Sequence, residues 1–316
     1  MPNHMSRRTL LQTTGATAAM LALGGRIRAQ SAPFSSGESR PTIFVPPKAC
    51  DAHIHIFDTR FPASPHWTGQ PVEDATVAAY RQLQARIGTS RAVIVNPSTY
   101  GIDNRCTLEA TQRMGRDARA VVVVDTDIAP TDLKTMADQG AVGVRVNFVT
   151  EQSWGETTVQ RLQDTCRLIA PLGWHVQIYA KAEQIEAMSD VLAGLPVPLV
   201  IDHLGRLPLP DGVDHPAFTT VRRLLDGGNT WVKLSGAYLN TETGAPAYAD
   251  ATVIAKVLAE AAPERMVWGS DWPHRGQKSL PDDAVLIDLL AEWVPDETTR
   301  NRILVENPVQ LYGFQE

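Results

Sequence analysis

Eight short apolar runs, most of them rich in valine and isoleucine, alternate along the chain with stretches that have helical periodicity. Strands buried on both faces read as continuous apolar runs, and a helix between successive strands is typical of a parallel sheet covered by helices. Eight such units are the number that closes a barrel, so the pattern predicts a (β/α)₈ TIM barrel rather than the competing doubly wound open sheet. The runs span residues 50–57, 91–96, 119–124, 141–147, 174–179, 198–202, 230–235 and 265–270.

The segments between the runs carry apolar residues every three or four positions, as an amphipathic helix does. We expect each apolar stripe to face the sheet. The stripes that support this interpretation are Tyr80, Leu83 and Ile87; Val159, Leu162, Cys166 and Ile169; and Val253, Val257 and Ala261.

The amino-terminal part of the chain differs from the rest. Ser6, Arg7 and Arg8 precede a mildly apolar run at residues 16–23, which is typical of a twin-arginine (Tat) signal peptide and too short for stable membrane insertion. We therefore expect residues 1–30 to be the signal, the Tat export machinery to be a partner, and the periplasm to be the destination. Residues 31–47, rich in Ser, Pro and Gly, predict a flexible lead-in, and residues 48–316 a single domain.

Charge and cysteine content narrow the function classes. The net charge of −6 argues against a general affinity for nucleic acid or anionic membrane. Cys50, Cys106 and Cys166 are odd in number and widely spaced, so neither a disulfide framework nor a cysteine zinc site is expected. We interpret them as buried structural thiols.

Polar residues stand where several of the predicted strands end. His53 and His55 lie two positions apart, so their side chains share one face of the first strand. His203 follows the sixth strand and Asp271 the eighth. Active sites of TIM barrels are built at the carboxyl ends of the strands, so these four side chains are the predicted catalytic residues and the predicted metal ligands.

Two other interpretations of these residues stay open. A single histidine after a strand is more often a hydrogen-bonded structural residue, and an exported binding protein without chemistry would also carry a signal and a polar pocket. Neither accounts for the combination of His53, His55, His203 and Asp271. The chain has no Gly-x-Ser-x-Gly motif, so a serine nucleophile is not expected.

Five motifs, at residues 51–55, 143–148, 174–179, 202–206 and 268–274, are similar in kind and order to those of the amidohydrolase superfamily, amidohydrolase-2 type. The resemblance runs from about residue 48 to 314, and lies in the branch that contains hydrolases of 2-pyrone-4,6-dicarboxylate and 4-sulfomuconolactone and an isomerase of galactarolactone. It implies a distorted barrel that hydrolyses a small anionic lactone. Asp271 would activate water, and His53, His55 and His203 would polarise the carbonyl directly or through a bound ion.

The resemblance leaves the cofactor open between one divalent metal, most naturally zinc, and no metal. Binuclear relatives use a modified lysine at the end of the fourth strand, where this chain has Arg145 and Asn147. Two metals are therefore not expected. His274 could orient Asp271 or the leaving group, and a solvent-facing or capping role is an equal alternative. His66, His175 and His215 are expected to lie outside the site.

Arg145, Arg206 and Tyr179 are the predicted substrate-binding residues, because a guanidinium binds a carboxylate or sulfonate in a planar fork. In the alternative interpretation, Arg145 pairs with a neighbouring acid. Glu151 stands where a pyrone dicarboxylate hydrolase would offer a further basic residue, which favours a muconolactone-type substrate such as 4-sulfomuconolactone. A sugar-acid lactone isomerase, in which we expect Asn in place of Asp271, and a zinc-dependent decarboxylase of a muconate-type or aromatic acid are the other candidate activities.

Overall fold

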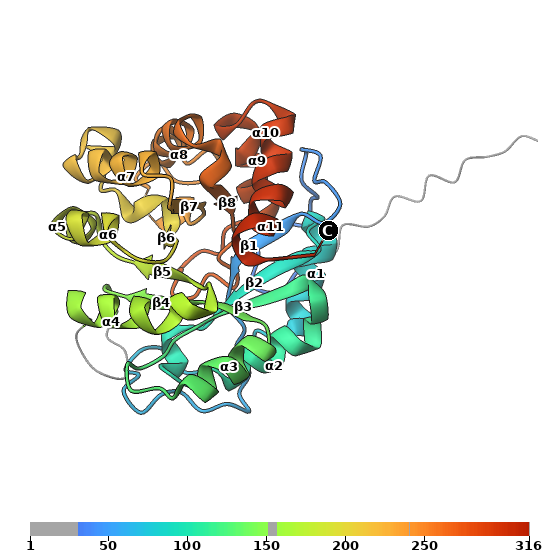
Figure 1. The fold of residues 1–316 in the computed structure, drawn as a ribbon. Coiled ribbons are helices and arrows are strands. Elements are labelled where there is room, and N and C mark those ends of the chain that lie inside the picture. The colour runs from blue at the N-terminus through green and yellow to red at the C-terminus, as the bar shows by residue number, and fades with distance from the viewer. Residues whose placement is uncertain (1–30, 151–156, 240, 316) are drawn as a thin grey trace, which may run out of the picture.

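The computed structural model describes residues 31–150, 157–239 and 241–315; the predicted signal peptide lies outside them. Eight parallel strands follow one another around the sheet in chain order, with helices packed outside them (Figure 1). The predicted α/β barrel is therefore confirmed. The strands are β1 (Cys50–Ile54), β2 (Arg91–Val95), β3 (Ala118–Val122), β4 (Ala141–Asn147), β5 (His175–Tyr179), β6 (Leu199–Ile201), β7 (Thr230–Leu234) and β8 (Met266–Trp268).

The barrel is distorted where β8 meets β1. Consecutive strands from β1 to β8 pair as parallel ladders, with register shifts in the β1–β2 and β3–β4 pairs, but β8 and β1 are joined through one bridge between Ile54 and Trp272. Two backbone hydrogen bonds, from Asp271 N to His53 O and from His55 N to Trp272 O, both 2.8 Å, complete this seam. The seam therefore joins the segment that carries the two histidines to the segment that carries Asp271.

Most strands are shorter than the apolar runs, and at β1, β6 and β8 the difference places polar side chains just beyond the sheet. β1 ends at Ile54, so His55 is the next residue. β6 ends at Ile201, so Asp202 and His203 follow it directly. Asp271 comes three residues after the end of β8. The backbone beyond the end of a strand no longer has the alternating side-chain directions of the strand. These polar side chains can therefore point into the mouth of the barrel.

A helix follows each strand, and the helix faces predicted from the sequence are partly correct. Tyr80, Leu83 and Ile87 are buried, as expected. The third stripe is wrong, because Val253 is 50% exposed while Ile254 and Leu258, on the adjacent face, are buried. In the second stripe, Val159 is exposed and the other three residues are buried. The helices are α1 (Val77–Ile87), α2 (Arg105–Met114), α3 (Pro130–Asp138), α4 (Val159–Ile169), α5 (Ala182–Ala187), α6 (Ser189–Ala193), α7 (Pro216–Asp226), α8 (Ala249–Ala261), α9 (Asp283–Trp293), α10 (Glu297–Asn301) and α11 (Asn307–Tyr312).

The segment before the barrel makes contacts that the prediction of a flexible lead-in did not anticipate. Trp272 Nε1 donates to Pro33 O at 2.8 Å, and Ser36 N donates to Pro281 O at 2.9 Å. Arg86 Nη2 donates to Ser35 Oγ at 2.6 Å. The start of this segment thus packs against the residue that follows Asp271.

The three cysteines are free and buried, as predicted. Burial raises the pKa of the Cys106 thiol to about 11 and that of Cys166 to about 12, so both stay protonated and unreactive. In the part of the chain that the structure describes, no helix is long and apolar enough to cross a bilayer.

Candidate active site

The two histidines of β1 meet at the mouth of the barrel. Their Nε2 atoms lie 3.3 Å apart, and their rings are nearly perpendicular. His55 Nδ1 lies 2.8 Å from Val95 O. Because a carbonyl oxygen only accepts, His55 carries a proton on Nδ1, and its Nε2, which has a free lone pair in the neutral ring, faces the site.

Asp271 brings the predicted catalytic residues together. Its Oδ1 lies 3.5 Å from His55 Nε2, 3.6 Å from His53 Nε2 and 4.0 Å from His203 Nε2. Both Asp271 and His203 have left-handed backbone, with φ of 65° and 51°. Such strain in non-glycine residues persists only where neighbouring contacts hold it, and it is enriched at functional sites.

The electrostatics of this cluster favour an ionised Asp271. Burial alone would raise its pKa, but His203, His55 and His53 outweigh that effect and hold the pKa well below its usual range. Burial lowers the pKa of His53 and of His203 below the usual value of a histidine. The cluster therefore combines a carboxylate able to accept a proton with imidazoles able to donate hydrogen bonds or bind a metal.

A second polar layer beneath the histidines was missing from the predicted site. Lys233, on β7, is fully buried, and its Nζ donates to Ala52 O at 2.9 Å and to Gln177 Oε1 at 2.7 Å. It also lies 3.2 Å from His53 Nδ1 and 3.7 Å from Asp202 Oδ1. A lysine in the middle of an otherwise apolar strand was the available sequence clue to this layer.

Asp202 is the anion of that layer. Its Oδ2 accepts from Arg145 Nε and Gln177 Nε2, both at 3.1 Å, and its Oδ1 lies 3.3 Å from His53 Nδ1. Burial would raise the pKa of Asp202, but His53, Lys233 and Arg145 together hold it well below its usual range. Burial lowers the pKa of Lys233 to about 8. Lys233 and Asp202 therefore both contact His53 Nδ1 and fix the orientation of the His53 ring.

The donor set fits one metal ion. Ligand atoms about 2.0–2.1 Å from a tetrahedral zinc lie roughly 3.3–3.4 Å apart, close to the separations among His53, His55 and Asp271. His203 lies at the edge of this set and also groups with His53 and Asp202. His53 Nδ1 has a partner in either tautomer, since it can accept from Lys233 or donate to Asp202. The site therefore suits one bound ion, and also suits histidines that act as donors themselves.

The predicted substrate-binding residues also lie together. Arg206 Nη1 donates to Tyr179 Oη at 2.6 Å, and the Tyr179 ring stands edge-on to His203 with centroids 5.5 Å apart. The Arg145 guanidinium lies 5.0 Å from the Tyr179 ring centroid. The bond from Arg145 Nε to Asp202 is the pairing with a neighbouring acid that the alternative interpretation of Arg145 expects. Two cations and a phenol thus flank His203.

Three histidines lie away from the cluster, as predicted. His66 is exposed, His215 caps the start of α7, and His175 is buried at the start of β5. His274 is buried, so the solvent-facing interpretation of this residue is wrong, and its backbone N–H donates to Asp271 O at 3.0 Å.

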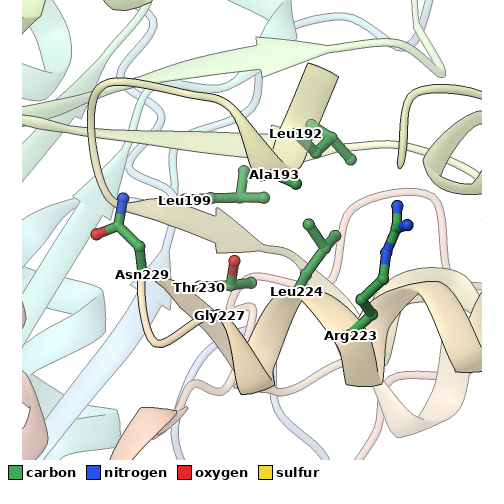
Figure 2. A pocket seen from close by; sticks show the side chains of 8 residues that line it. All are labelled: Leu192, Ala193, Leu199, Arg223, Leu224, Gly227, Asn229 and Thr230. Carbon is green, nitrogen blue, oxygen red and sulfur yellow. The ribbon is translucent and has the colours of Figure 1, made fainter. Parts of the chain in front are cut away.

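A separate hollow lies between α6 and α7 (Figure 2). It includes Leu199 and Thr230, the first residues of β6 and β7. It therefore lies at the amino-terminal end of those strands, opposite the catalytic cluster. In barrels of this kind that end serves stability rather than chemistry.

Similarity to known proteins shows to which family this chain belongs. The family model described as "Amidohydrolase" matches residues 50–314. This chain belongs to the amidohydrolase family. The 4-sulfomuconolactone hydrolase of Hydrogenophaga intermedia is 36% identical over 86% of this amidohydrolase and 91% of the relative. The D-galactarolactone isomerase of Agrobacterium fabrum is 31% identical over 86% and 93% of the two chains.

A solved structure extends the likeness to three dimensions. The probable 2-pyrone-4,6-dicarboxylic acid hydrolase of Acinetobacter baumannii, described with bound citric acid, is 27% identical and has a TM-score of 0.75. The match covers 84% of this amidohydrolase and 100% of that chain.

Proposed function

We propose that this amidohydrolase hydrolyses a small anionic lactone of the muconolactone type, such as 4-sulfomuconolactone. The observation that carries the proposal is the position of Asp271 Oδ1, within 4.0 Å of the Nε2 atoms of three histidines. The named relative that acts on 4-sulfomuconolactone supports the choice of substrate.

The proposed chemistry needs no covalent enzyme intermediate. Asp271 Oδ1 takes a proton from water as the water oxygen bonds to the lactone carbonyl carbon. The ring C–O bond then breaks, and Asp271 returns the proton to the leaving oxygen, which gives the ring-opened acid. Hydrogen bonds from His53 and His203 to the carbonyl oxygen would stabilise the negative charge that develops on it.

The same residues would hold a metal if one is required. His53, His55 and Asp271, with His203 at the edge, would bind one divalent ion, and this donor set suits zinc. Such an ion would supply Lewis-acid polarisation of the carbonyl. His55 would serve here through its free Nε2 lone pair.

Arg145, Arg206 and Tyr179 would hold the anionic group of the substrate. Arg206 is partly exposed, and its bond to the Tyr179 oxygen leaves the phenol proton free to donate. Because these residues flank His203, a carboxylate or sulfonate bound by them would place the ring near Asp271.

The test is to incubate purified protein with 4-sulfomuconolactone and a neutral lactone in a pH-stat and to identify the products by NMR. The metal content of the same protein is measured in parallel. Acid release with a ring-opened product supports the proposal. An isomerised ring would favour the galactarolactone isomerase activity, which the 31% identical relative makes the second candidate. Carbon dioxide release would favour the decarboxylase.

We further propose that residues 1–30 direct the folded enzyme through the Tat machinery to the periplasm. The paired Arg7 and Arg8 support this. Replacement of both by Lys should retain the enzyme inside the cell when fractions are probed by immunoblot. Unchanged export of the double variant would contradict it.

A further inference from the structure

A series of hydrogen bonds begins at Asp271 Oδ2, the carboxylate oxygen that does not face His53, His55 and His203. Tyr238 Oη lies 2.6 Å from Asp271 Oδ2 and 2.9 Å from His274 Nδ1. His274 Nε2 lies 3.1 Å from each carboxylate oxygen of Asp283. Three separate segments contribute: the turn after β7, the turn after β8, and the first residue of α9.

The proton count along this chain sets the direction of each bond. A carboxylate that serves as a base accepts hydrogen bonds, so the single proton of the Tyr238 phenol points to Asp271 Oδ2. The phenol oxygen is then left to accept, so His274 Nδ1 donates to it, and Nε2 faces the carboxylate of Asp283.

Both ring nitrogens of His274 therefore have a hydrogen-bond partner. Asp283 is fully buried at the amino-terminal end of α9, where the helix dipole favours negative charge. Buried polar groups are stable only when each of their polar atoms is satisfied. Here the second ring nitrogen is satisfied by Tyr238.

We propose that Tyr238 and His274, supported by Asp283, are positioning residues for the base: they hold Asp271 Oδ2, so that Oδ1 alone faces the imidazoles and the attacking water. This inference rests on the proposed lactone hydrolysis only for its effect on turnover. A carboxylate rotates about its terminal bond unless both oxygens are engaged, and rotation would take Oδ1 out of line with the carbonyl. Neither Tyr238 nor His274 touches the substrate in this scheme.

The variant Tyr238→Phe removes one hydroxyl and keeps the ring. We expect kcat to fall about 10–100-fold, which is the usual effect of removing a residue that hydrogen-bonds and orients a metal-ligating or catalytic side chain. KM and the denaturation midpoint should stay close to wild type. The matched control is Tyr312→Phe, because the Tyr312 hydroxyl is buried and, among the described residues, makes no hydrogen bond. Equal kcat in Tyr238→Phe and wild type would overturn the proposal, as would a fall in kcat explained by lost folding.

A second measurement does not depend on any substrate. In protein labelled with ¹⁵N-histidine, His274 is assigned as the imidazole missing from His274→Gln. We expect Nδ1 of His274 to be protonated in wild type, where it donates to Tyr238, and to lose its proton in Tyr238→Phe. An unprotonated Nδ1 in wild type would reverse the bond directions and refute the proposed hydrogen-bond series. If wild type hydrolyses no lactone but Nδ1 of His274 is protonated, the proposed function fails and the hydrogen-bond series stands.

Discussion

Asp271→Asn tests the proposed base with the smallest change of shape. In wild type the Tyr238 hydroxyl donates to Asp271 Oδ2 at 2.6 Å, so an amide nitrogen cannot occupy that place without two donors facing each other. The amide oxygen will therefore turn to Tyr238, and the amide nitrogen will face the lone pair of His55 Nε2, 3.5 Å away in wild type. The side chain keeps hydrogen-bond partners, so the fold should survive.

The expected effect on turnover follows from the lost proton acceptor. General-base catalysis contributes about 10²–10⁴-fold, which is roughly 3–5 kcal/mol in the activation free energy. Because the amide nitrogen faces the water site, no other oxygen of residue 271 replaces the base. We expect kcat to fall within that range.

The assay is the initial rate of acid release from 4-sulfomuconolactone, with circular dichroism and thermal melting to confirm folding. The matched control is Asp125→Asn, which makes the same change in an acid that follows β3, outside the cluster. A folded Asp271→Asn enzyme with more than a tenth of wild-type kcat would refute the assignment of Asp271 as the base.

Three other predictions address binding, metal and pH. Arg206→Met should raise KM for anionic lactones more than for neutral ones, and equal effects in steady-state kinetics would assign Arg206 to structure. His55→Gln should lower the zinc content of protein reconstituted with zinc, measured by atomic emission, and an unchanged content would exclude His55 as a ligand. Burial lowers the pKa of His175 to about 3, so between about pH 6.5 and 3 the unfolded chain binds a proton that the folded chain does not. The free energy of unfolding therefore falls with falling pH in this window, by about 2 kcal/mol from pH 7 to pH 5 due to His175. In denaturant titrations, the free energy of unfolding of His175→Leu should fall by about 2 kcal/mol less than that of wild type between pH 7 and pH 5. The control is His66→Gln, because His66 is exposed. An equal fall in wild type and His175→Leu would contradict the burial argument.

Much of the fold was predictable because its signals are local. Continuous apolar runs form strands buried on both faces, and the eight runs all became strands. The stripe on α8 was predicted on the wrong face because Val253 and Ile254 are both apolar, and only the packing of the helix decides which one is buried.

The candidate catalytic residues were predictable from position, whereas their support was not. His53 and His55 lie at the carboxyl end of β1, His203 and Asp271 follow β6 and β8, and the barrel brings strand ends to one mouth. Tyr238, His274 and Asp283 form a chain only because the turns after β7 and β8 meet the start of α9.

The sequence by itself therefore determined the barrel and which end of it gathers the candidate catalytic residues, because hydrophobic periodicity and strand polarity are properties of neighbouring residues. Only the tertiary structure decided which buried charges pair, such as Lys233 with Asp202 and Arg145 with Asp202. Those pairs join residues far apart in the chain. Their strength depends on burial and on distances of a few ångströms, which linear spacing does not encode.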